Sequence, residues 1–162
     1  MRSNAPLRMY GQVSSNPQLA WSWVDTRLTE AELYWVDVAG SGRRPHPRPV
    51  WGVWNDELLH LSVGTPAIRR AADPGTGATV HLGDGIDVVI VEGDVVGPTE
   101  SADVIAAYNS KYEWDYDLAQ YGPLTTIRPT TVLAWRAAGP AGRDGFQHTG
   151  RWTWDTPSND AS

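Results

Sequence analysis

The chain contains no cysteine, and this absence removes several chemistries together. Disulfide bonds, thiolate metal ligands and cysteine nucleophiles are excluded, and a cysteine-free chain fits a reducing compartment, so we expect a cytoplasmic protein. No run of the sequence approaches the roughly 18 apolar residues of a transmembrane helix. The N-terminal stretch MRSNAPLRMYGQVSSNPQ also has no long apolar segment. We therefore expect neither a membrane partner nor a signal peptide.

Positive charge is scarce as well. Lysine and arginine together number 13 against 19 aspartates and glutamates, which gives a formal net charge of -6. Because binding to a phosphate backbone requires a basic face, we expect no nucleic-acid partner.

Common catalytic and metal-binding motifs are missing too. None of the HxH, HExxH or HxxxH spacings typical of metal sites occurs among the histidines, and we expect no metal; the histidines are His46, His60, His81 and His148. A GxSxG motif is absent, which argues against a hydrolase. Two pairs of carboxylates are closely spaced in the sequence, Asp84 with Asp87 and Asp115 with Asp117. Because each pair falls in a predicted turn or loop, we interpret these residues as solvated turn acids and not as catalytic groups.

Tryptophan, in contrast, is abundant, with nine residues against a single phenylalanine. Two interpretations stay open at this point. Large aromatic side chains commonly pack cores and interfaces, and some of these tryptophans could instead line a site for a flat aromatic ligand.

The sequence pattern predicts a mainly β protein, namely a small antiparallel barrel of about seven strands with two or three helices outside it. We expect one domain over residues 17–156, with a flexible N-terminal arm at 1–16 and a disordered tail at 157–162. The predicted strands cover 33–38, a segment ending near 54, 57–64, 78–82, 86–97, 128–137 and 146–154. The predicted helices cover 17–32, a short segment from Thr65, and 99–112, and an acidic, aromatic loop follows the last of these. The first helix has an apolar face with Trp21, Val24 and Leu28, and the last has an apolar stripe with Val104, Ile105, Tyr108 and Tyr112.

Asn55 and Asp56 are the predicted turn before the strand at 57–64. The run from Val88 to Val91 is apolar on both faces and predicts a central strand that is covered on both sides.

Three prolines in phase precede one of these strands, in the stretch RPHPRPVWGVW. Pro45, Pro47 and Pro49 remove the N–H donors from one side of the segment, so that side can have no regular sheet partner. The sequence therefore predicts an edge or extended segment up to Val50. Gly52 then marks a point where another backbone or a flat ligand can come close.

An anion site is suggested where the strand at 57–64 runs into a helix. Thr65 and Pro66 are typical of a helix start, whose free N–H groups attract anions. Arg69 and Arg70 follow and can donate charge-assisted hydrogen bonds. The alternative is an ordinary exposed helix with solvated arginines.

Several stretches taken together resemble the pyridoxamine 5'-phosphate oxidase-like, flavin-binding split-barrel family. They are LYWVDVAGSGRRPHPRPVWGVWNDELLHLSVG, ATVHLGDGIDVVIVEGDV, AAYNSKYEW, RPTTVLAWRA and RWTW, and they span roughly residues 28–154. The resemblance implies a homodimer with two cofactor sites at the subunit interface. The implied cofactor is flavin mononucleotide (FMN) or the deazaflavin coenzyme F-420.

The resemblance also implies which residues hold the cofactor. The ring would lie along Val50, Trp51 and Gly52, with Trp51, Trp54 and Trp152 as candidates for pocket walls and the loop at 113–126 over the partner's site. The phosphate would be held by a second group, namely Ser62, Val63, Gly64, Thr65, Arg69 and Arg70. This chain departs from the family pattern at Val63 and Ala67, where the family usually has hydroxyl residues, and at Arg69, where lysine is more common.

The implied function is that of an oxidoreductase that transfers a hydride to or from a small hydrophobic or conjugated substrate. In such proteins the chemistry belongs mainly to the cofactor. The alternative is a non-enzymatic carrier or sensor of flavin, deazaflavin or haem on the same barrel.

Overall fold

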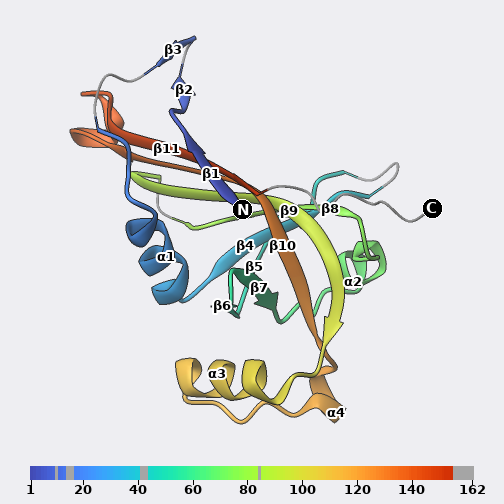
Figure 1. Cartoon of the computed structure of the whole chain (residues 1–162). Helices are drawn as coiled ribbons and strands as arrows, with labels where there is room; N and C mark the ends of the chain where they lie inside the picture. Colours follow the sequence, from blue (N-terminus) through green and yellow to red (C-terminus); the bar gives the residue numbers. More distant parts are fainter. Residues whose placement is uncertain (10, 14–16, 41–43, 84, 155–162) are drawn as a thin grey trace.

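The computed structural model describes residues 1–9, 11–13, 17–40, 44–83 and 85–154. The predicted disordered tail at 157–162 lies outside these residues. Figure 1 shows a long, strongly curved sheet with α1 beside it and with α3 and α4 together at one end. The helices are α1 (Trp21–Glu30), α2 (Pro66–Ala71), α3 (Ala102–Tyr112), α4 (Leu118–Tyr121) and the 3-10 turn η1 (Pro140–Gly142). The strands are β1 (Arg2–Ala5), β2 (Arg8–Met9), β3 (Gln12–Val13), β4 (Tyr34–Val38), β5 (Arg48–Val50), β6 (Gly52–Asn55), β7 (Leu58–Leu61), β8 (Gly77–His81), β9 (Asp87–Thr99), β10 (Leu124–Ala137) and β11 (Phe146–Trp154).

The main sheet is antiparallel and curves into a nearly closed barrel. Its pairings run from β6 through β7, β10, β9, β8 and β4 to β5, while β11 and β1 continue outward from β10. Strand β10 makes both branches possible, because residues 125–127 pair with β7 and residues 131–137 pair with β11. The two ends of the ring, β5 and β6, are separated only by Trp51, and the barrel is split there. The predicted class, an antiparallel split barrel with flanking helices, is confirmed.

The three prolines lie where an edge was predicted. β5 pairs only with β4, placing Pro49 opposite Trp35 and Arg48 opposite Val36. The N–H of His46, one of the donors that the prolines leave, donates to the Asp37 carboxylate at 2.9 Å. The other side of the segment therefore has no strand next to it among the described residues.

The β6/β7 hairpin turns at Asp56 and Glu57, one residue later than the predicted turn at Asn55 and Asp56. Both residues have positive φ, +50° and +56°. This geometry matches the type I′ turn, whose twist suits a two-residue hairpin loop. Positive φ at two acidic residues is unusual, and the composition alone does not indicate it.

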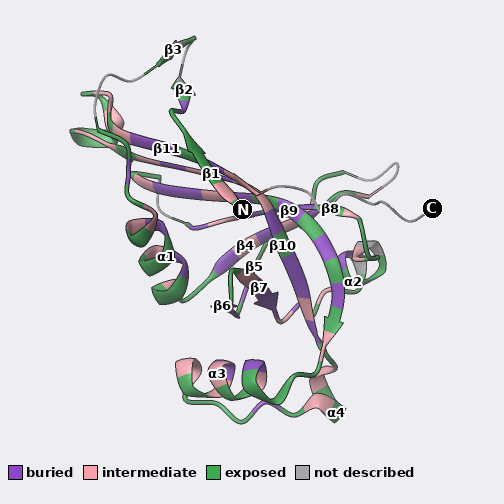
Figure 2. Cartoon of the chain, viewed as in Figure 1, coloured by how far each residue is buried: buried purple, intermediate pink, exposed green. Residues whose placement is uncertain are grey.

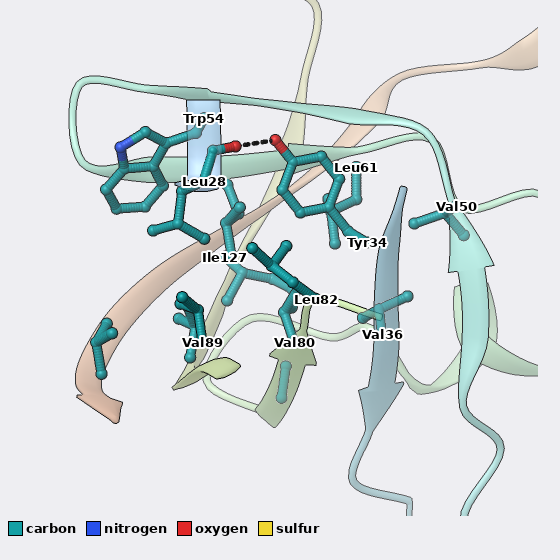
Figure 3. Close-up of a cluster of buried hydrophobic side chains, with 14 of the residues drawn as sticks. Leu28, Tyr34, Val36, Val50, Trp54, Leu61, Val80, Leu82, Val89 and Ile127 are labelled. Carbon is teal, nitrogen blue, oxygen red and sulfur yellow. Dashed lines mark hydrogen bonds between the residues drawn. The ribbon is translucent and has the colours of Figure 1, made fainter. Parts of the chain in front are cut away.

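The main core lies between the curved sheet and α1 (Figure 3). Val24 and Leu28 are buried on the predicted face of α1, and the Tyr34 hydroxyl donates to the Leu28 carbonyl at 2.5 Å. Figure 2 shows buried and exposed residues alternating along the second half of β9. In its first half Val88, Val89 and Val91 are buried and Ile90 is partly buried, so the predicted covered run is found except at Ile90.

A second, smaller core lies under α3, which contacts β6. Val104 and Tyr108 of the predicted apolar stripe are fully buried, and Ile105 and Tyr112 are partly buried against the same cluster. This core also contains Val53, Tyr116 and Leu124. It holds the 113–122 segment against the open side of the barrel, next to the split at Trp51.

The N-terminal arm is partly ordered against the sheet. β1 pairs with β11, with Arg2 opposite Trp154 and Ala5 opposite Arg151. The Arg2 guanidinium lies 4.0 Å from the centre of the Trp21 ring and forms an ion pair with Glu57. The predicted flexibility of the rest of the arm at 1–16 stays a prediction.

Candidate functional site

A cavity of about 390 Å3 opens beside Trp51, at the split in the barrel. One wall comes from the barrel, at the end of β5 and in the connection between β7 and α2, and the other comes from α3 and the 113–122 segment. We call this the first cavity; it is lined by Pro49, Val50, Trp51, Ser62, Gly64, Thr65, Tyr108, Trp114, Tyr116 and Tyr121. Its volume is near the lower end of the ~300–1,000 Å3 typical of ligand pockets.

Aromatic rings form most of the second wall. Trp51 is stacked on Tyr112 with ring centres 4.5 Å apart and planes 4° apart, and Trp114 meets Trp51 edge-on at 5.8 Å. Tyr108 and Tyr116 continue the cluster at 5.0 Å. Although stacked, Trp51 is 40% exposed, and Trp114 is 46% exposed. Flat apolar surfaces with hydroxyl tips are therefore presented to the cavity.

The hydroxyl groups of the first cavity form a short polar network. The Tyr116 hydroxyl donates to the Gly122 carbonyl at 3.1 Å and lies 3.5 Å from the Ser62 hydroxyl. Burial raises the pKa of Tyr108 to about 12, so that this hydroxyl keeps its proton at neutral pH. None of the described residues that line the cavity is a carboxylate, histidine, lysine or arginine. The cavity can donate and accept hydrogen bonds, but only through tyrosine and aliphatic hydroxyls and the backbone.

Five of the residues implied by the resemblance meet in the first cavity: Val50, Trp51, Ser62, Gly64 and Thr65. Val63, between them, instead turns its side chain into the core, where it is 3% exposed. An apolar residue suits this buried position, which gives a physical reason for the missing hydroxyl. The backbone of Ala67 lies in α2.

Gly52 is required by a neighbouring backbone. A Cβ atom built on Gly52 would lie 2.5 Å from the Leu61 side chain and 2.7 Å from the His60 carbonyl oxygen. Of the two interpretations that the sequence left open, the close approach of another backbone is therefore the one found. The Gly52 N–H also has a partner, because it donates to the Tyr112 hydroxyl at 2.9 Å.

The two predicted arginines lie next to the cavity, outside its lining. The Arg69 guanidinium donates from Nε to the Val63 carbonyl at 2.8 Å and from Nη2 to the Tyr121 carbonyl, and thus connects the two walls. Arginine has five N–H donors, so three remain for another acceptor. Arg70 is exposed. Helix α2 has only 6 residues, so its dipole adds little to an anion site.

Two of the predicted wall tryptophans belong to the core instead. Trp152 is 2% exposed and meets Trp21 edge-on at 5.5 Å. Trp54 is also buried, and its Nε1 donates to the Asp25 carboxylate at 2.8 Å. Neither residue lines the first cavity, so the core-packing interpretation holds for these two tryptophans. Trp51 and Trp114 do line the cavity, and a ligand site there stays a prediction.

Sequence reasoning did not single out four of the lining residues, namely Tyr108, Trp114, Tyr116 and Tyr121. The last three lie in the loop at 113–126 that was expected to cover the partner's site. The aromatic density of YEWDYDLAQY is the signal that could have identified them. Tyr108 was assigned only to the packing stripe of α3. In the single chain, these side chains line that chain's own first cavity.

A second cavity of about 560 Å3 is lined by both of the stacked rings, Trp51 and Tyr112. We call it the second cavity; it is lined by Thr29, Glu30, Glu32, Trp51, Ser110, Lys111, Tyr112 and Glu113. Trp51 is shared by both cavities. The second cavity is polar and acidic, in contrast to the first.

Over the described part of the chain, no group of three or more His, Cys, Asp or Glu side chains is placed to hold a metal ion. No helix among the described residues has the length and apolar character needed to cross a membrane.

Comparison with known proteins gives similarity only at the level of structure. No model of a protein family matches the chain, and no curated protein matches it in sequence. A FAD-binding protein from Mycobacterium smegmatis is similar at a TM-score of 0.51 and 17% identity, over 85% of this chain and 98% of the other. A FAD-binding protein from Mesorhizobium loti is similar at a TM-score of 0.50 and 16% identity, over 84% of this chain and 96% of the other.

At these identities the likeness concerns the fold. It extends over most of both chains. The chain therefore has the split β-barrel fold of these FAD-binding proteins, the fold that its resemblance to pyridoxamine 5'-phosphate oxidase-like proteins implies.

Proposed function

We propose that this chain binds a flavin-type cofactor in the first cavity and acts as an oxidoreductase on a small hydrophobic or conjugated substrate. The observation that carries the proposal is the meeting of Val50, Trp51, Ser62, Gly64 and Thr65 around one cavity. The resemblance names these residues as cofactor ligands, and two solved structures of the same fold are FAD-binding proteins.

The residues present fit such a group at both of its ends. The exposed faces of Trp51 and Trp114 offer flat surfaces for a ring system, and aromatic pairs add about 0.5–1.5 kcal/mol beyond area burial. At the other end, the N–H groups of Gly64 and Thr65 have no hydrogen-bond acceptor among the described residues. Together with Arg69 and Arg70 they would hold a phosphate. When bound, the cofactor supplies hydride transfer.

The protein's own contribution is binding and exclusion of water. The aromatic wall would cover the ring, and the high pKa of Tyr108 keeps a neutral hydroxyl beside it. Because the described lining has no carboxylate, histidine, lysine or arginine, proton transfer would depend on hydroxyl groups or solvent. This same observation favours the second candidate, a non-enzymatic carrier of flavin, deazaflavin or haem.

The experiment is a visible spectrum of the purified protein, followed by titration with FMN, FAD, F-420 and haem. We expect at least one flavin-type cofactor to bind at one per chain. Trp51→Ala should weaken binding by about 0.5–1.5 kcal/mol, whereas Trp135→Ala, a ring that meets Phe146 away from the cavity, should not. A protein that binds none of these cofactors would overturn the proposal.

Turnover separates the two candidate functions. If the bound cofactor is reduced and a quinone or an unsaturated ester reoxidises it at a catalytic rate, the chain is an oxidoreductase. If the cofactor binds without turnover on such acceptors, the carrier function is supported.

Arg69 offers a sharper test of the phosphate end. Arg69→Ala should weaken FMN binding by about 1–3 kcal/mol if the guanidinium meets the phosphate. Since Arg69 also connects Val63 and Tyr121, riboflavin is the necessary comparison, because it has the ring without the phosphate. An equal loss for FMN and riboflavin would mean that Arg69 acts only by holding the walls together. Arg151→Ala, an exposed arginine on β11 outside the cavity lining, serves as the matched control.

A further inference from the structure

Lys111 is the single lysine of the chain, and the other 12 basic residues in the Lys+Arg total of 13 are arginines. Arginine keeps its proton in proteins, whereas a lysine can lose its proton when it is buried. Lys111 is therefore the one side chain that can present a neutral primary amine. Lys111 lies on α3 and lines the second cavity, where a neutral amine could meet a ligand.

Two hydrogen bonds fix the Lys111 amine. Its Nζ donates to the Tyr34 hydroxyl at 2.9 Å and to the Gly52 carbonyl at 3.1 Å. The Tyr34 hydroxyl gives its own proton to Leu28, so it meets Lys111 as an acceptor. An ammonium has three N–H donors, and two are used here. In the neutral amine, the remaining position holds the lone pair.

No carboxylate forms an ion pair with Lys111 among the described residues. The titratable groups around it are the hydroxyls of Tyr34 and Tyr112 and the carboxylates that line the second cavity, Glu30, Glu32 and Glu113. Burial dominates, and it lowers the pKa of Lys111 to about 8. Desolvation without a paired charge is the environment in which lysine acts as a nucleophile.

The second cavity also indicates which compounds would fit. Its three carboxylates repel anions, and with Thr29 and Ser110 they offer acceptors for hydroxyl or ammonium groups. The stacked rings of Trp51 and Tyr112 supply a flat wall. At about 560 Å3 the cavity is large enough for a small ligand.

We propose that Lys111 is a carbonyl-reactive amine that forms an imine with a small, uncharged or cationic, hydroxylated aldehyde held in the second cavity. The neutral Nζ attacks the carbonyl carbon, a C–N bond forms, and the carbonyl oxygen takes up a proton. In the resulting carbinolamine, the nitrogen keeps one of its two hydrogens. When the C=N bond forms, the C–O bond breaks and the oxygen leaves as water, so that both hydrogens of the amine end in that water molecule. Amine and aldehyde give imine and water, so no oxidant or reductant is needed.

The test uses the purified full chain with glycolaldehyde at pH 7, with cyanoborohydride present to trap the imine, and peptide mass mapping as the readout. At pH 7 an amine of pKa about 8 is about 10% neutral, against less than ~0.1% for an ordinary lysine. We expect Lys111 to be modified at least about tenfold faster than a free blocked lysine under the same conditions. Glyoxylate, which is anionic, should react more slowly at Lys111 than glycolaldehyde.

Three comparisons keep the proposal falsifiable. Lys111→Arg should leave only the N-terminal amine modified. The native chain should react faster at Lys111 than the same chain in concentrated urea, and this comparison needs no variant to fold. If the folded chain reacts at the rate of the blocked lysine or more slowly, Lys111 only bridges Tyr34 and Gly52, and the proposal is wrong. Since no flavin is required, either result leaves the proposed cofactor site to be tested separately.

Discussion

A tight steric constraint acts on Gly52, where β6 begins. The strand is held so close to β7 that a methyl group would meet the Leu61 side chain and the His60 carbonyl oxygen. The carbonyl of Gly52 also accepts from Lys111 and its N–H donates to Tyr112, so the position of this one residue sets the positions of two functional candidates.

We expect Gly52→Ala to lower the free energy of unfolding by about 1–3 kcal/mol, because overpacking forces backbone shifts. Gly77→Ala in β8 is the matched control, since a Cβ there meets nothing within 4 Å. Urea unfolding of both variants measures the difference. Equal stabilities of the two variants would contradict the steric account.

The buried lysine and tyrosine predict how stability depends on pH. The pKa of Lys111 falls from 10.5 to about 8 on folding. Between these values the unfolded chain binds one proton more than the folded chain, so stability rises with pH. Burial also raises the pKa of Tyr108 from 10.0 to about 12. Over that window the unfolded tyrosine loses its proton while the folded one keeps it, so stability falls.

Denaturant unfolding at a series of pH values should therefore show stability rising from about pH 8 to about pH 10 and falling above it. Lys111→Met removes the titrating amine and should abolish the rise while keeping the fall. A rise that persists in this variant would show that another group causes it.

At the scale of elements, the single turn α4 positions part of the first cavity. The Asp117 carboxylate accepts from the N–H groups of Ala119 and Gln120 and so caps this helix. α4 ends at Tyr121, which lines the cavity and is held through its carbonyl by Arg69. So short a helix depends strongly on its cap.

Asp117→Ala should cost about 0.5–2 kcal/mol of local stability, which corresponds to about 2- to 30-fold faster amide exchange. Hydrogen exchange at Tyr121 and Gly122, whose N–H groups donate within this turn, measures the effect. Asp115→Ala, in the same segment and exposed, is the control. Exchange that is unchanged in Asp117→Ala would mean that the tyrosine packing alone holds the segment.

The seven predicted strands are all present because each has a local signal, either alternation or a continuous apolar run between turn residues. The interruption at Trp51 has no such signal, since it results from β5 pairing with β4 and β6 pairing with β7. β1 was not predicted for the same reason, because it is polar and has no local signal, and its strand structure comes from its pairing with β11. α4 was assigned to a loop because one turn has no periodicity to detect.

The part of the candidate site that comes from one continuous stretch of sequence was predictable. Val50, Trp51, Ser62 and Gly64 belong to a stretch that carries the resemblance, and Thr65 follows it directly. The tyrosine wall was not predicted, because it depends on how α3 crosses the open side of the barrel. Trp152 shows the converse, since an aromatic residue in a resembling stretch turned out to pack in the core.

At the scale of the whole molecule, the homodimer implied by the resemblance stays a prediction. Large apolar side chains are exposed on the single chain, among them Leu33, Trp51, Val96 and Trp114. Such residues are common at subunit interfaces.

We expect light scattering to give twice the chain mass of 17.8 kDa. The mass should fall toward that of one chain only on strong dilution, as mass action requires. A mass of one chain at all concentrations would contradict the dimer, and the first cavity would then have to bind its cofactor within a single subunit.

The pairing of β1 with β11 has a consequence for the order of folding during synthesis. β1 precedes every other described strand in the sequence, and its partner β11 follows them all. Residues 2–5 must therefore wait, unpaired, until 151–154 have left the ribosome, and the contact that closes this edge of the sheet spans nearly the whole chain. Such a contact carries a high entropic cost of loop closure. Residues 2–5 are thus expected to be among the last of the described residues to become ordered.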